Sequence, residues 1–214
     1  MSTFDWESFL RQWSQELIES LQEERYRLPL EVIDSNWLGY PGATEEQINR
    51  AETRLKVRLP PSYREFLKVS NGWRQTTPFI ERLWSTEELE WFSLRHQAWI
   101  DNFISGYLTI NYRNVTANGS EDRRIIPFIS DAEYFTYGET QDCSKLRLEY
   151  LQTVLEISQE GDSAIYLLNP QVVNAEGEWE AWFFANWLPG ADRYPSFYEM
   201  MQAEYINFLE LREN

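Results

Sequence analysis

Residues 42–73, GATEEQINRAETRLKVRLPPSYREFLKVSNGW, predict two short amphipathic helices that meet at a pair of prolines. Thr44 followed by Gln47 is a capping box, in which each side chain satisfies a free amide at the start of a helix. Pro60 and Pro61 must end that first helix, because proline lacks an amide donor and disfavours a helical residue before it. The segment therefore predicts a sharp elbow between two helices.

The second helix has an equally clear start and end. Pro61 suits its first position, and Asn71-Gly72 supplies a left-handed stop. The positions expected to face inward are Tyr63, Phe66, Leu67 and Ser70. Because Ile48, Ala51 and Leu55 give the first helix its own apolar face, the two helices are expected to share one buried interface.

Residues 3 to about 26 predict a further amphipathic helix. Its apolar residues recur at steps of three and four and are Trp6, Phe9, Leu10, Trp13, Leu17, Ile18 and Leu21. We expect residues 1–35 to form a helical extension that packs on a domain of residues 36–214. The alternative is an exposed helix that binds a partner.

Downstream of Gly72 the pattern changes to strands. Segments rich in β-branched and aromatic residues predict strands at 79–84, 107–110, 125–129, 146–157, 164–168 and 180–187, and residues 94–104 predict a helix. Ser196 with Glu199 forms another capping box, which opens a closing helix. Helices, then strands, then a final helix predict an α+β fold with a mostly antiparallel sheet flanked by helices.

Segment 42–73 resembles the signature of the SUKH superfamily (the SMI/KNR-type domain), which includes bacterial toxin-immunity proteins and fungal regulators of cell-wall synthesis. The matching residues are Ala51, Glu52, Leu55, Leu59, Pro60, Ser62, Tyr63, Phe66, Leu67, Asn71 and Gly72. The resemblance covers about residues 37–210 and implies a protein-binding scaffold without a cofactor, in which the motif residues are structural. This sequence departs from the pattern at Lys56, where members often have glycine, and over residues 94–142, which have no clear counterpart.

The charge is strongly negative and uneven. Asp and Glu number 35 against 19 Lys and Arg, which gives a net charge of −16. Residues 148–214 hold twelve acids and two bases, so they carry −10 of that charge. Such a field repels phosphates and anionic lipids, which disfavours nucleic acid and membrane partners, and it attracts a basic protein. The alternative is an ordinary solvated acidic surface.

The residues needed for common catalytic and metal sites are missing. His96 is the only histidine and Cys143 the only cysteine, so a zinc site lacks ligands and no nucleophile motif is formed. Glycine-rich phosphate-binding motifs are absent, and no spacing selects one pair of carboxylates. We therefore predict no catalytic residue, cofactor or metal, and no enzyme. One cysteine, no signal peptide and no long apolar run predict a cytoplasmic protein.

Two tracts combine acids with aromatic rings, a chemistry that suits Lys and Arg of a partner. In residues 130–143, SDAEYFTYGETQDC, the candidates are Asp131, Glu133, Tyr134 and Tyr137; in residues 174–180, NAEGEWE, they are Glu176, Glu178 and Trp179. The alternative is that these are solvated loops whose rings lie in the core. The leading hypothesis is an immunity protein that occludes a basic toxin surface. The second is a regulatory scaffold that binds several proteins.

Overall fold

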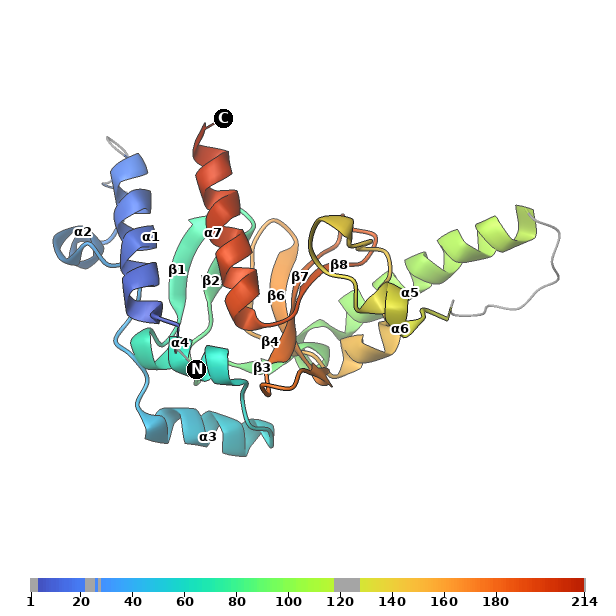
Figure 1. Cartoon of the computed structure of the whole chain (residues 1–214), viewed down its shortest axis with the longest axis horizontal. Coiled ribbons are helices and arrows are strands. Elements are labelled where there is room, and N and C mark those ends of the chain that lie inside the picture. The colour runs from blue at the N-terminus through green and yellow to red at the C-terminus, as the bar shows by residue number, and fades with distance from the viewer. Residues whose placement is uncertain (1–3, 22–25, 27, 118–127, 214) are drawn as a thin grey trace.

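Helices flank two antiparallel sheets, so the predicted α+β class is confirmed (Figure 1). The computed structural model describes residues 4–21, 26, 28–117 and 128–213. A three-stranded sheet has the order β1 (Trp73–Thr77), β2 (Ile80–Leu83), β5 (Ser158–Glu160). A five-stranded sheet has the order β3 (Glu90–Trp91), β4 (Leu155–Glu156), β6 (Ala164–Val173), β7 (Trp179–Ala185), β8 (Ala191–Tyr194).

The predicted N-terminal helix is present as α1 (Trp6–Ser20), which is followed by the short α2 (Leu30–Ser35). Helix α1 begins after Asp5, whose carboxylate accepts a hydrogen bond from the Ser8 amide at 3.0 Å. Its buried face consists of Trp6, Leu10, Trp13, Ser14, Leu17 and Ile18. Trp6 packs edge-on against Phe66 at 5.6 Å between ring centroids. The helix is therefore part of the core, although the division at residue 35 stays a prediction.

The predicted elbow joins α3 (Glu45–Leu55) to α4 (Pro61–Val69). Both hydrogen bonds of the capping box of Thr44 and Gln47 are formed, and Pro61 is the first residue of α4. Lys56 closes α3 in the left-handed region, with φ of 59°. Gly72, after the end of α4, has φ of 105°, which explains the glycine in the Asn71-Gly72 stop.

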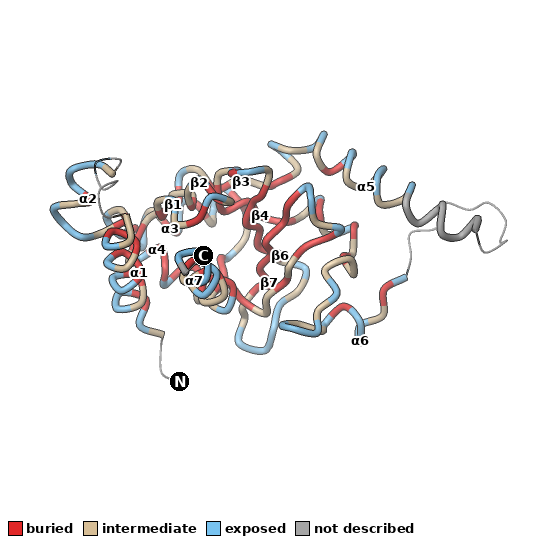
Figure 2. The backbone as a smooth tube through the Cα atoms, turned by 90° about the horizontal axis from the view of Figure 1, so that it is seen from above, coloured by how far each residue is buried: buried red, intermediate tan, exposed pale blue. Residues whose placement is uncertain are grey.

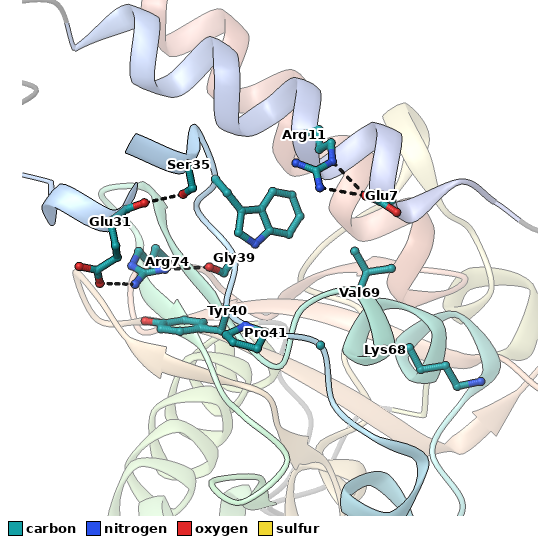
Figure 3. A pocket seen from close by; sticks show the side chains of 12 residues that line it. Glu7, Arg11, Glu31, Ser35, Gly39, Tyr40, Pro41, Lys68, Val69 and Arg74 are labelled. Carbon is teal, nitrogen blue, oxygen red and sulfur yellow. Dashed lines mark hydrogen bonds and ion pairs between the residues drawn. The ribbon is translucent and has the colours of Figure 1, made fainter. Parts of the chain in front are cut away.

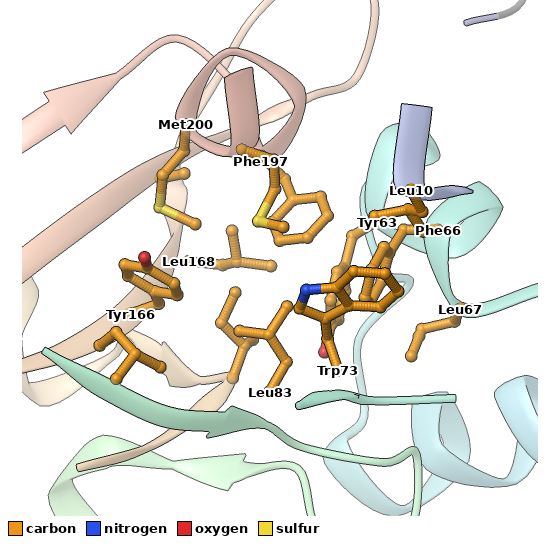
Figure 4. Close-up of a cluster of buried hydrophobic side chains, with 14 of the residues drawn as sticks. Leu10, Tyr63, Phe66, Leu67, Trp73, Leu83, Tyr166, Leu168, Phe197 and Met200 are labelled. Carbon is orange, nitrogen blue, oxygen red and sulfur yellow. The ribbon is translucent and has the colours of Figure 1, made fainter. Parts of the chain in front are cut away.

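Two hydrophobic cores lie on opposite faces of the five-stranded sheet. The residues of β4, β6 and β7 are mostly buried (Figure 2). Tyr166 and Phe183 face α7 (Phe197–Glu213) and the helical core shown in Figure 4. Ile165 and Phe184 face α5 (Phe92–Ala117) and the 3-10 helix η3 (Leu148–Gln152). Neighbouring residues of one strand point to opposite faces, so an almost continuous apolar strand serves both cores.

Two predicted strands are wrong. Residues 107–110 belong to α5, because Trp99, Ile100, Phe103, Ile104 and Tyr107 recur at helical spacing and pack on one core. Residues 146–157 form η3 and only a short β4. The predicted strand at 125–129 falls mostly outside the described residues. The helix predicted at 94–104 lies within α5 and has a kink at His96, where φ is −126° and ψ is 32°.

Candidate protein-binding site

Segment 130–143 covers the outer edge of the five-stranded sheet beside β8. It contains α6 (Asp131–Tyr134) and the 3-10 helix η2 (Gly138–Thr140). The Gln141 side chain exchanges two hydrogen bonds with the backbone of Arg193, at 2.6 and 2.7 Å. It thereby satisfies edge groups of β8 that would otherwise be unpaired.

The two tyrosines of this segment converge on a buried carboxylate, Glu180. The Tyr134 hydroxyl donates to it at 2.7 Å and the Tyr137 hydroxyl at 3.0 Å, while Arg193 lies 3.3 Å away. Burial, followed by the charge of Glu180, raises the pKa of Tyr134, so this hydroxyl remains a donor. Tyr134 is fully buried, which is the core alternative considered from the sequence.

The two predicted acids of α6 are exposed but already paired within the chain. Asp131 lies 2.5 Å from Arg147, and Glu133 lies 3.4 Å from Lys145. Glu133 also closes a capping box with Ser130. A partner would have to compete with these contacts, so their role in binding stays a prediction.

The second predicted tract, residues 174–180, consists of a turn and the first two residues of β7. The Glu178 carboxylate accepts hydrogen bonds from the amide and the hydroxyl of Ser62, at 2.8 and 2.6 Å. It therefore caps α4 and explains the serine of the motif. Trp179 is buried, and only Glu176 points into solvent.

The other motif residues are also structural. Leu59, Tyr63, Phe66 and Leu67 lie in the helical core, and Pro60 is buried. The Asn71 side chain accepts a hydrogen bond from the Thr86 amide at 2.7 Å, which ties the stop after α4 to the segment beyond β2.

The single histidine, His96, and the single cysteine, Cys143, lie in different surroundings. His96 Nε2 lies 3.2 Å from the buried Glu156 carboxylate, and its ring stacks on Phe92. Burial, with the charges of Asp192 and Asp142, raises the pKa of the Cys143 thiol and disfavours the reactive thiolate. Among the described residues, no group of acids, histidine and cysteine could hold a metal ion. Within the same residues, every helix is too short or too polar to span a bilayer.

A cleft of about 750 Å³ lies between α1, α2 and α4 (Figure 3). Its charges are matched inside the chain. Arg11 pairs with Glu7 at 2.9 Å, and Arg74 pairs with Glu31 at 3.3 Å while lying over the Tyr40 ring at 4.2 Å. Because its cations are neutralised and stacked, this cleft presents little unmet charge to a ligand.

A smaller hollow of about 300 Å³ lies between the C-terminal half of α7 and strands β7 and β8. We define the hollow by the rings of Phe79, Phe183, Trp187 and Tyr194 and by the carboxylates of Asp192 and Glu204. The α7 side chains Asn207, Glu210 and Leu211 complete its lining, which includes no basic residue. Burial raises the pKa of Asp192, and burial followed by the charge of Asp192 raises that of Glu204.

Further acids surround the hollow. Glu81 of β2, Glu160 at the end of β5 and Asp162 in the turn before β6 are exposed, and they form no ion pair with any described residue. The bases, by contrast, mostly pair with acids of the first 147 residues, as in Arg82–Glu88 and Arg54–Glu90. We call Glu81, Glu160, Asp162, Asp192 and Glu204 the acidic end of the molecule.

Sequence reasoning identified the acidic C-terminal part but not the hollow. Phe79 follows β1, Trp187 follows β7, and Glu204 lies on α7, so their proximity depends on the tertiary fold. The available local signal was the acidic turn around Gly161 beside an aromatic strand.

The comparison with known families agrees with this architecture. A model of the SMI1 / KNR4 family (SUKH-1) matches residues 42–203. That range includes the elbow and both sheets, and it leaves α1 and α2 outside. No curated protein matches the chain.

Proposed function

The chain belongs to the SMI1/KNR4 family (SUKH-1), and from this premise we propose that it neutralises a basic toxin by binding and covering its active surface. The family supports a function of the immunity or regulator type, carried out by protein binding rather than catalysis. The proposed compartment is the cytoplasm. The proposed partner is a protein, because the net charge of −16 repels nucleic acid and anionic membranes.

One observation carries the proposal: the five acids of the acidic end form no ion pair with any described residue, whereas the described bases mostly pair with acids elsewhere in the chain. Asp192 has no ion pair among the described residues, although burial makes its charge costly. A basic partner would supply the missing cations. Long-range attraction would accelerate its approach, and contacts at the hollow would then slow its release.

The test is capture of partners from native lysate by the tagged chain at low and moderate salt, followed by affinity measurement with the purified partner. We expect one tight, basic protein whose binding weakens with salt, and inhibition of that protein's toxicity by the chain. Several weak partners would favour the regulatory scaffold instead. No salt-sensitive partner at all would contradict the proposal.

Charge reversals locate the surface. The double variant Glu160→Lys/Asp162→Lys should weaken binding about tenfold, mainly through slower association. Asp34→Lys/Asp101→Lys is the matched control, since both acids are exposed and lie on α2 and α5. Asp131→Lys/Glu133→Lys tests the segment predicted from the sequence. An effect in that variant alone would move the surface to α6.

A further inference from the structure

The hollow combines an aromatic corner with the Asp192 carboxylate, which forms no ion pair with any described residue. We propose that it receives the side chain of one arginine from the basic partner, an inference that rests on the proposed function. The guanidinium would lie against the Trp187 indole and hydrogen-bond the Asp192 carboxylate.

The ring geometry suits a flat cation. The rings of Phe79, Phe183 and Trp187 contact one another, with centroids 5.8 to 6.1 Å apart. Their planes meet at 52° to 83°, so they form a corner rather than a stack. Trp187 is 51% exposed, which leaves its ring accessible. An indole face is the best aromatic surface for a cation, and guanidinium is the cation that most often stacks there.

The acids complete the site. Asp192 lies on β8 directly opposite Phe183 of β7, which brings its carboxylate to the aromatic corner. It accepts no hydrogen bond from any described residue, so both of its oxygens remain available to the fork of a guanidinium. Glu204 is 3% exposed and is held by the Tyr166 hydroxyl at 2.5 Å. It therefore forms a fixed polar base for the hollow.

Contacts within the chain hold Trp187 and Phe79 of the hollow in place without a ligand. The Trp187 indole donates a hydrogen bond to the Asp162 carbonyl at 3.2 Å. Gly161 lies so close to the chain at Phe79 that a Cβ at this position would be 2.9 Å from the Phe79 carbonyl oxygen. A pre-formed site loses little conformational freedom on binding.

Size and shape favour arginine over other occupants. A volume of about 300 Å³ is at the lower limit of ligand pockets and suits one side chain rather than a large cofactor. Lysine would offer a compact, strongly hydrated charge that cannot stack as a plane or pair with both oxygens of a carboxylate. An apolar side chain would cover the Asp192 carboxylate without supplying a cation.

The test uses the full ¹⁵N-labelled chain and the blocked amino acid N-acetyl-arginine methylamide, with the lysine and norleucine analogues as comparisons. The readout is the indole N–H signal of Trp187, assigned with Trp187→Phe. We expect a saturable shift with arginine and a much weaker response to lysine and norleucine. Asp192→Asn should weaken binding tenfold or more, whereas Asp101→Asn, an exposed acid on α5, should not change it. Equal responses to the three probes, or no effect of Asp192→Asn, would overturn the assignment.

Affinity measurements with the captured partner distinguish a failure of the arginine site from a failure of the proposed function. Trp187→Ala and Asp192→Asn should each weaken the complex tenfold or more, provided that their thermal unfolding matches wild type. If the partner binds both variants unchanged, the arginine site is wrong and the immunity proposal stands. If the probe binds but no protein does, the proposed function fails, and with it the assignment of the arginine to a protein partner.

Discussion

Lys56 carries a conformational cost at the end of α3. Its φ of 59° lies in the left-handed region, where a residue with a Cβ is less stable than glycine by about 1 to 2 kcal/mol. Glycine loses more freedom on folding, which offsets part of this difference. We therefore expect Lys56→Gly to raise the free energy of unfolding by about 1 kcal/mol, measured by urea denaturation with an unchanged m-value.

Lys56→Ala is the matched control, because it removes the exposed lysine side chain and keeps the Cβ. Its free energy of unfolding should stay within about 0.5 kcal/mol of wild type. An equal gain in both variants would show that the lysine side chain, and not the backbone, is the cause.

The two helix caps of the elbow differ in how well they can be predicted from the sequence. The capping box of Thr44 and Gln47 spans three residues and could be predicted, because both partners lie in one turn. Glu178 performs a similar role for Ser62 from 116 positions away. The local sequence around an acid in a turn is the same whether the acid caps a distant helix or faces solvent. The partner of Glu178 therefore could not be predicted from the sequence.

At the scale of elements, α1 lies outside the family match but inside the core. Leu10 is fully buried, and Ser14 accepts a hydrogen bond from the Leu38 amide at 3.1 Å. We propose that this extension is required for the stability of the domain. Leu10→Ala should lower the free energy of unfolding by about 2 to 5 kcal/mol, through lost burial and the cavity that remains.

Leu94→Ala makes the same substitution in α5, where the leucine is 71% exposed, and should cost less than about 0.5 kcal/mol. Urea denaturation followed by far-UV circular dichroism compares the two variants. Equal stabilities would mean that α1 does not unfold together with the sheets and is an independent appendage.

The elements also show why the strand predictions failed selectively. Segments 164–168 and 180–187 could be predicted as strands, because both faces of β6 and β7 are covered and the strands are apolar throughout. Residues 107–110 have a similar local composition, but the positions that precede them recur at helical spacing. A short apolar segment is ambiguous until the element that contains it is known.

At the scale of the whole molecule, the positive and negative charges are unevenly distributed, and the acidic end has an excess of negative charge. Most bases of the described chain are paired with acids at contact distance, such as Arg82 with Glu88 at 2.6 Å. The five acids of the acidic end form no ion pair with any base that the structure describes. The sequence could predict the acidic C-terminal part, but the hollow required the tertiary positions of Phe79, Asp192 and Glu204.

This uneven distribution predicts that salt stabilises the free protein. The Debye length is about 10 Å at 0.1 M salt and about 3 Å at 1 M. Contact ion pairs are therefore screened little, whereas repulsion between the more distant unpaired acids is screened strongly. From 0.05 to 0.5 M NaCl, the free energy of unfolding should rise on the order of 1 kcal/mol, the scale of one close like-charge contact in water.

The matched control for the salt effect is Glu160→Gln/Asp162→Asn, in which two charges of the acidic end are removed without a large change of shape. Its stability in low salt should be higher than that of wild type, and its gain on adding NaCl should be smaller. A stability that falls with salt would mean that the paired bases dominate the electrostatics. Because partner binding is expected to weaken with salt while the fold strengthens, loss of a complex at moderate salt cannot then be attributed to unfolding of this chain.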